Sequence, residues 1–215
     1  MPLLPAAPRE PRPQVAPSKR LVARLLERLG PPPGFSPHPA LVVLVGPPGA
    51  GKTSFARRLA EAAPVAVVSS DWVRKTLHPT PVYSDRGHIH VFVHAFALVR
   101  ALLRQGEAVV FDAINLRESG RRPLYRIATQ AGARLAVVRL TAPAQVVRAR
   151  FAGRTSDRAA WDLSDATYEV YEALAAAEEP VRRPHLELDT SGDVEGSLAG
   201  LAWFVGHPEA APPSN

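Results

Sequence analysis

From residue 41 onward, the chain alternates short apolar runs with longer stretches of helix-forming composition. The apolar runs predict buried strands at 41–45, 65–69, 108–112, 135–140 and 185–188. The intervening stretches predict helices at 52–62, 72–77, 88–105, 117–131, 143–152, 164–178 and 193–205. Because strands joined by helical crossovers form parallel sheets, we expect a parallel sheet with helices on both faces.

The two ends of the chain differ from this alternating pattern. Residues 1–17 are dominated by Pro and Ala, which predicts a disordered Pro-rich tail. Residues 18–40 combine a short amphipathic helix with a Pro-rich linker, and we expect the helix to pack on the domain or on a partner. Its shared apolar face consists of Leu21, Leu25, Leu26 and Leu29. We expect residues 41–206 to form the folded domain and residues 207–215 a frayed tail.

Composition limits the class of protein. The chain has 215 residues, of which 46% are hydrophobic and 21% are charged, and this suits one globular domain. It contains no Cys, which excludes disulfides, thiolate metal sites and cysteine nucleophiles. No apolar run approaches the roughly 18 residues of a membrane span, and the N-terminus lacks the apolar core of a signal peptide. We therefore expect a cytoplasmic protein without a membrane partner.

One motif predicts the chemistry. Gly46-Pro-Pro-Gly49-Ala50-Gly51-Lys52-Thr53 fits the phosphate-binding P-loop and lies between the strand at 41–45 and the helix at 52–62. We expect the backbone of this loop to bind the phosphates of ATP through Gly46, Gly49, Ala50, Gly51 and Ser54. Lys52 would reach the β- and γ-phosphates, and the Thr53 hydroxyl would hold Mg²⁺. The predicted fold is therefore a P-loop NTPase three-layer α/β sandwich with a five-stranded parallel sheet.

Ligands of such folds bind beyond the carboxyl ends of the strands. After the second predicted strand comes Ser69-Ser70-Asp71-Trp72-Val73-Arg74. Asp71 is a candidate general base that accepts a proton from an attacking hydroxyl or orients it. Arg74 shares its helix face and could either pair with Asp71 or bind an acceptor phosphate. A simpler role for Asp71 or Ser70 is that of helix N-cap.

The third predicted strand ends in Asp112-Ala113-Ile114-Asn115. Asp112 resembles the aspartate of a Walker B element and could orient a Mg²⁺-bound water or line the acceptor pocket. ATPases that activate water usually carry Glu at the next position, so Ala113 favours transfer to a bound acceptor over hydrolysis. The chain also lacks an N-K-x-D signature, which argues against a GTPase.

An arginine-rich segment follows the fourth predicted strand, and Gly153 interrupts its helical pattern. This segment is a candidate lid over the triphosphate. Arg154 and Arg158 are the candidates for stabilising charge on the transferred phosphoryl group, although a solvated helix end would have the same composition. Upstream, the helix at 88–105 contains three histidines. No third ligand accompanies the metal-like spacing of His90 and His94, so we expect this helix to line the acceptor cleft.

Together these motifs resemble the polynucleotide 5′-kinase family, including single-domain bacterial relatives of end-repair kinases. The resemblance covers roughly residues 41–190 and includes the segment Asp112-Ala-Ile114-Asn115-Leu-Arg-Glu-Ser-Gly-Arg121-Arg122-Pro123. It implies an ATP- and metal-binding pair in Lys52 and Thr53, a general base in Asp71 and an acceptor contact in Arg74. It also assigns Asp112 and Asn115 to the D-A-T-N motif, Arg121 to a further acceptor-side contact, and Arg154 and Arg158 to the lid. Ile114 departs from the family, which has Thr there.

The resulting hypothesis is an ATP- and Mg²⁺-dependent kinase that phosphorylates a hydroxyl group. A polynucleotide 5′-OH is the first candidate acceptor, because the net charge is +6 and residues 1–40 carry six basic against two acidic side chains. The scarcity of aromatic residues for base stacking favours a small-molecule acceptor instead, such as a nucleoside, a sugar or an antibiotic. A third possibility is an ATP-binding switch protein without kinase activity, with a partner docked on the N-terminal helix.

Overall fold

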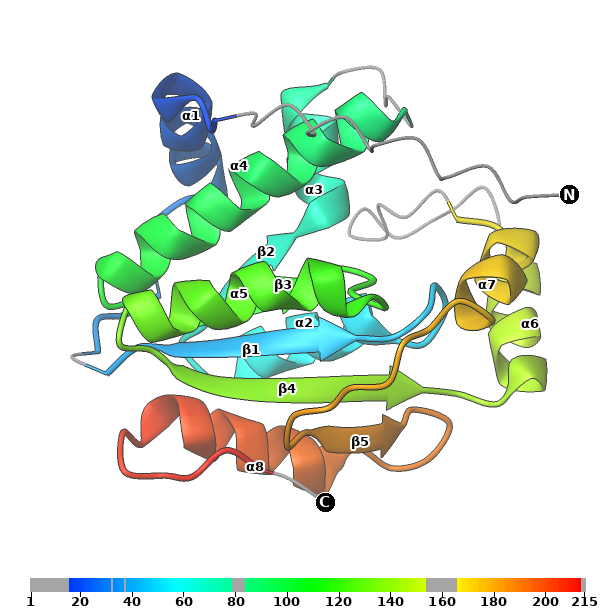
Figure 1. The fold of residues 1–215 in the computed structure, drawn as a ribbon. Coiled ribbons are helices and arrows are strands. Elements are labelled where there is room, and N and C mark those ends of the chain that lie inside the picture. The colour runs from blue at the N-terminus through cyan, green and yellow to red at the C-terminus, as the bar shows by residue number, and fades with distance from the viewer. Residues whose placement is uncertain (1–15, 32, 37, 79–83, 154–165, 214–215) are drawn as a thin grey trace, which may run out of the picture.

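The computed structural model describes residues 16–31, 33–36, 38–78, 84–153 and 166–213. A five-stranded parallel sheet forms its centre, in the order β2-β3-β1-β4-β5 (Figure 1). The strands are β1 (Ala40–Val45), β2 (Ala66–Ser69), β3 (Val109–Asp112), β4 (Arg134–Thr141) and β5 (Leu186–Asp189). The predicted α/β class and five-stranded parallel sheet are confirmed.

Helices cover both faces of the sheet. α4 (Asp85–Arg104) and α5 (Glu118–Gln130) pack on one face, and α2 (Lys52–Ala62) and α8 (Glu195–Gly206) pack on the other. Every residue of β1 is buried, and its side chains alternate between the two cores. This double burial explains why β1 is a continuous apolar run and not an alternating one.

Three shorter helices lie around the carboxyl ends of the strands. They are α3 (Ser70–Leu77), α6 (Ala144–Ala152) and α7 (Tyr168–Ala175). α3 begins two residues earlier than predicted because Ser69 is its N-cap, with the Trp72 N–H donating to Ser69 Oγ at 3.4 Å. α7 ends at Ala175 and is therefore shorter than the predicted 164–178. None of the helices in the described segments is long and apolar enough to cross a membrane.

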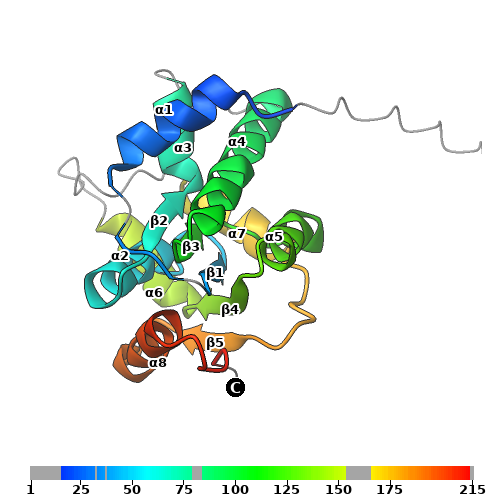
Figure 2. The same ribbon diagram turned by 90° about the vertical axis from the view of Figure 1, so that its left-hand side faces the viewer.

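α1 (Lys19–Leu29) lies across the outside of α3 and α4 and adds a partial fourth layer (Figure 2). Leu25 is fully buried, and Leu26 and Leu29 pack against the same core. At the start of the helix, the Ser18 N–H donates to Nε2 of buried His94 at 3.0 Å. His94 Nδ1 therefore carries the proton and donates to the His90 carbonyl at 2.8 Å. In the structure this helix packs on the domain, which is one of the two arrangements that we expected.

The start of the C-terminal tail is held against the domain. Arg134 donates from Nη1 to the carbonyls of Phe204 and His207, and its guanidinium lies 4.5 Å from the centroid of the Phe204 ring. The structure thus has residues 207–210 in contact with the domain, where composition predicted a tail that frays from His207. Sequence composition suggested fraying because it does not show an arginine on a distant strand that binds these carbonyls.

Replacing Leu25 with Ala tests how α1 is attached. Loss of this fully buried side chain should weaken the docking of α1 by about 2–4 kcal/mol. Because α1 lies outside the sheet sandwich, we expect hydrogen exchange to accelerate mainly in residues 19–29. Arg24→Ala, a change on the exposed face of the same helix, is the control and should leave exchange unchanged. Uniform acceleration across the sheet in the Leu25 variant would show that α1 belongs to the cooperative core instead.

Candidate functional site

The P-loop joins β1 to α2 through backbone conformations that favour glycine. Gly46 has φ +150°, and a Cβ there would lie 2.4 Å from the Leu140 carbonyl oxygen. Gly49 has φ +78°, and its Cβ would lie 2.8 Å from the side chains of Val147 and Phe151. The loop can therefore lie flat against β4 and α6 only with these two glycines.

Lys52 is the first residue of α2, and Gly51 is the N-cap in a left-handed conformation without a side-chain cap. The first-turn N–H groups of α2 thus lack a capping side chain and suit a bound anion. Lys52 is only 8% exposed, and its Nζ donates to the Pro47 carbonyl at 2.8 Å across the loop. The geometry is that of an anion cradle with a buried cation at its edge.

Thr53 connects the P-loop to the end of β3. Its hydroxyl donates to Asp112 Oδ2 at 2.8 Å. Asp112 is 4% exposed, and burial raises the pKa of its carboxyl, while the charge of Lys52 and the hydrogen bond from Thr53 act in the opposite direction. A hydroxyl and a carboxylate at this separation form the oxygen donor set that Mg²⁺ prefers, so the two residues fit a magnesium ion between loop and strand.

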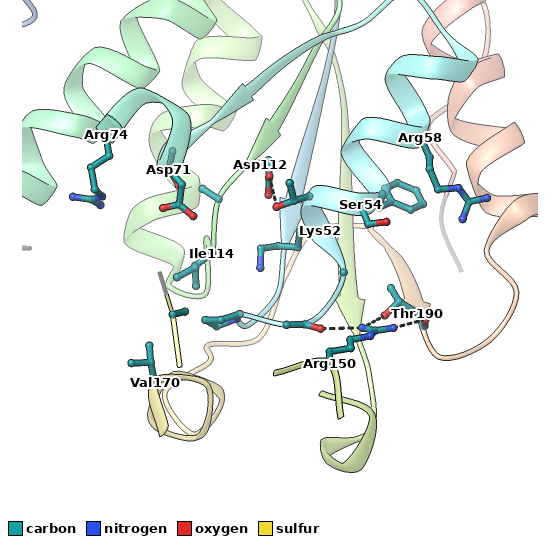
Figure 3. Close-up of a pocket in the computed structure, with 18 of the residues that line it drawn as sticks. Lys52, Ser54, Arg58, Asp71, Arg74, Asp112, Ile114, Arg150, Val170 and Thr190 are labelled. Atoms are coloured by element: carbon teal, nitrogen blue, oxygen red, sulfur yellow. Dashed lines mark hydrogen bonds between the residues drawn. The ribbon is translucent and has the colours of Figure 1, made fainter. Parts of the chain in front are cut away.

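The same cavity contains three of the five predicted acceptor residues. Its volume is about 970 Å³, and its lining includes Gly49, Gly51, Lys52, Thr53, Ser54, Ser70, Asp71, Arg74, Asp112 and Ile114. In the view of Figure 3, Asp71 lies between Arg74 and Lys52. Since Ser69 is the N-cap of α3, capping is not the reason for a carboxylate at Asp71. The structure thus brings Lys52 and Thr53 of the predicted donor site into the same space as Asp71, Arg74 and Asp112 of the predicted acceptor site.

Two predicted acceptor residues do not line this cavity. Asn115, at φ +50°, donates from Nδ2 to the Leu44 carbonyl at 2.8 Å and so ties the loop after β3 to β1. Arg121 is fully buried and donates to four backbone carbonyls, those of Asn115, Leu116, Glu179 and Pro180. It also pairs with Glu118 at 3.1 Å. The donors of Arg121 thus already hold two chain segments together. The geometry therefore does not support a contact between Arg121 and the acceptor.

The cavity also contains residues that the sequence did not single out. Arg150 on α6 donates to the Gly49 carbonyl at 2.9 Å and to the Thr190 carbonyl at 2.8 Å, which joins the P-loop to the loop after β5. Val170, Arg58 and Val194 also line the cavity, as does His88, which lies on the helix that we expected to line the acceptor cleft. Arg150 belonged to the predicted arginine-rich lid, but spacing alone could not separate it from its neighbours. Arg154 and Arg158, the predicted lid arginines, lie outside the described residues.

Comparison with known proteins places these features in a family. A family profile described as "AAA domain" matches residues 41–180, the segment that contains both halves of the cavity. The chain belongs to this AAA domain family. The match includes the P-loop, Asp71, Arg74 and Asp112, and it begins after α1 and its linker.

The chain is also similar to part of a longer curated protein. The uncharacterized protein Rv2004c of Mycobacterium tuberculosis is 29% identical over 177 residues, which cover 77% of this chain and 34% of that protein. The chain thus spans about a third of the length of the curated relatives that it matches.

Solved structures of two kinases are similar in fold. The APS kinase CysC of Mycobacterium tuberculosis has TM-score 0.58 at 19% identity, covering 77% of this chain and 96% of that one. A gluconokinase from Sinorhizobium meliloti has TM-score 0.54 at 23% identity, covering 78% and 94%. The chain therefore has a P-loop kinase-like fold.

Arg121→Met tests the structural position of Arg121. Removing the guanidinium takes one buried donor away from Glu118 and from four carbonyls, which should cost about 3–5 kcal/mol of unfolding free energy. Denaturant unfolding measures this cost. Arg122→Met, at an exposed neighbour that also pairs with Glu118, should cost no more than about 1 kcal/mol. Equal losses of unfolding free energy in the two variants would contradict the conclusion that Arg121 holds these two chain segments together.

Asp112→Asn should separate stability from function. A raised pKa means that folded Asp112 binds its proton more tightly than the unfolded chain does. Its contribution to stability is therefore present at low pH and declines as pH rises through the folded-state pKa. The Asn variant should lose this pH dependence and, at pH 8 without ligands, unfold at an equal or higher temperature than the wild type. It should also bind Mg²⁺-nucleotide more weakly, whereas an apo protein that is clearly less stable at pH 8 would contradict the assignment.

Proposed function

We propose that this protein is an ATP- and Mg²⁺-dependent kinase that transfers the γ-phosphoryl group of ATP to a hydroxyl acceptor. The observation that carries the proposal is the shared cavity: the P-loop lysine, the Thr53–Asp112 pair and the carboxylate of Asp71 line one space. Phosphoryl transfer needs donor phosphate and acceptor hydroxyl held in line, and catalysis comes mainly from positioning and charge stabilisation.

Each side chain has a definite part in this proposal. Lys52 leaves the Pro47 carbonyl and binds the β- and γ-phosphates, while Thr53 and Asp112 hold Mg²⁺, which neutralises phosphate charge when bound. Asp71 accepts the proton of the acceptor hydroxyl or fixes its direction. Arg150 keeps the P-loop and the loop after β5 in register around the nucleotide.

The absence of Glu after Asp112 supports transfer over hydrolysis. Ala113 is 3% exposed and lines the cavity at the position where water-activating ATPases carry a carboxylate. The apolar side chains of Ile114 and Val170 extend this wall on the acceptor side. Such apolar side chains offer no group that would activate a water beside Asp71, which favours transfer to a bound alcohol over hydrolysis.

For the acceptor, a polynucleotide 5′-OH is the first hypothesis. Its support is an exposed basic row on α5 and at its N-cap, formed by Arg117, Arg122 and Arg126. A small-molecule alcohol is the alternative. It is supported by the lining, because among the described lining residues the only ring side chains besides Pro48 are His88 and Phe55, and Phe55 is 3% exposed.

Two substitutions test the kinase proposal. Lys52→Ala should weaken ATP binding and reduce transfer by about three orders of magnitude or more. Asp71→Asn should leave ATP affinity within about twofold and reduce transfer by about 10²–10⁴-fold, because only the acceptor proton loses its partner. Nucleotide titration calorimetry and labelled-phosphate transfer to 5′-OH oligonucleotides, nucleosides and sugars provide the two readouts. Unchanged transfer in Asp71→Asn would refute the base assignment. If ATP binds and the cellular effect is lost in Lys52→Ala but kept in Asp71→Asn, the protein acts as an ATP-binding switch instead.

A further inference from the structure

The acceptor half of the cavity contains a second polar group besides Asp71 and Arg74. His88 stands in the first turn of α4 and lines the cavity, and its residue surface is exposed. Arg74 comes from α3 and is 6% exposed. The two helices pack against each other, so one side chain from each converges on the same wall.

The orientation of His88 is fixed by its neighbours. Its ring lies against Phe92 one turn later, with centroids 4.5 Å apart, and Phe92 in turn packs against the core. Ser84 caps the helix start by accepting from the Gly87 N–H at 3.2 Å. These contacts hold the imidazole at the cavity wall, unlike His90 and His94, which contact each other's rings and the start of α1.

The charges around His88 differ between the empty and an occupied cavity. Burial and the positive charge of Arg74 lower the pKa of His88, while Asp85 on its own helix raises it more weakly. Asp71 is the other charged group of α3 in the same cavity. An anion placed between Arg74 and His88 would screen Arg74 and favour the imidazolium. In the empty cavity, Arg74 is the one strong cation of this wall. When an anion binds, the protonated His88 becomes the second.

We infer that Arg74 and His88 together form an anion-binding subsite, and that the acceptor alcohol carries a phosphate, sulfate or carboxylate group there. This inference rests on the proposed kinase function. Asp71 lines the same cavity and lies between Arg74 and Lys52 in the view of Figure 3, so an alcohol anchored at the subsite would present its hydroxyl toward Asp71 and the P-loop. His88 then sets specificity by selecting acceptors with an anionic group beyond the reacting hydroxyl.

Sulfate is the probe, because it does not titrate between pH 6 and pH 8. With AMPPNP and Mg²⁺ filling the P-loop, sulfate should shift the imidazole NMR signals of His88. It should also bind about three- to tenfold more tightly at pH 6 than at pH 8, since protonation adds a charge to the subsite. His88→Asn should abolish this pH dependence. His90→Asn, a change in the same helix at a ring directed to His78, should preserve it. Equal sulfate affinity at both pH values without a shift of His88, or no binding, would overturn the inference.

The design separates this inference from the kinase proposal. AMPPNP binding is measured first, and its absence would count against the kinase proposal alone. In that case sulfate is titrated into the Lys52→Ala variant, because its P-loop lacks the cation that would otherwise compete for sulfate. Transfer to matched alcohols identifies the source of the anion. Thymidine 3′-monophosphate is compared with thymidine, and gluconate with glucose, and the anionic member of an accepted pair should have the higher kcat/KM. A preference for the neutral member would refute the subsite.

Discussion

The parallel register of β2, β3 and β1 is the constraint on which the site depends. Ser69 at the end of β2 pairs with Asp112 at the end of β3, and β3 in turn pairs with β1, from which the P-loop begins. Three consecutive strand ends therefore meet at one edge of the sheet. The hydrogen bond from Thr53 to Asp112 closes this edge, and α3 starts immediately beside it with Asp71 in its first turn. Without that register, the donor and acceptor residues would be far apart.

Buried polar contacts then fix the loops around this edge. Arg150 holds the P-loop to the loop after β5, and Arg121 holds the loop after β3 to the chain that leaves α7. Each arginine uses several donors of one planar group to tie backbone segments that are distant in sequence. The two cavity walls are thus set by side chains that do not themselves need to touch the acceptor.

Sequence predicted the parts of this structure that depend on local patterns. The central strands β1 and β3 were found because double burial makes them runs with almost no polar residue, and the P-loop because its spacing is dictated by phosphate binding. The N-cap of α3 was missed because Ser69, Ser70 and Asp71 are all good caps, and only the backbone decides between them. Arg121 was misassigned because its motif position says nothing of its full burial. His88 lies on the helix that was expected to line the acceptor cleft, whereas Thr190 was not singled out, since only the packing of separate elements brings it to the cavity.

The site as a whole has a donor half built on β1 and β3 and an acceptor half built on α3 and α4, and the apolar side chains of Ile114 and Val170 also line the cavity. The fate of the γ-phosphate tests this account most directly. Wild-type protein incubated with γ-labelled ATP and a panel of anionic and neutral alcohols should place the label in an alcohol ester, and Asp71→Asn should remove that product. Label recovered only as inorganic phosphate, at a rate that Asp71→Asn leaves unchanged, would contradict it.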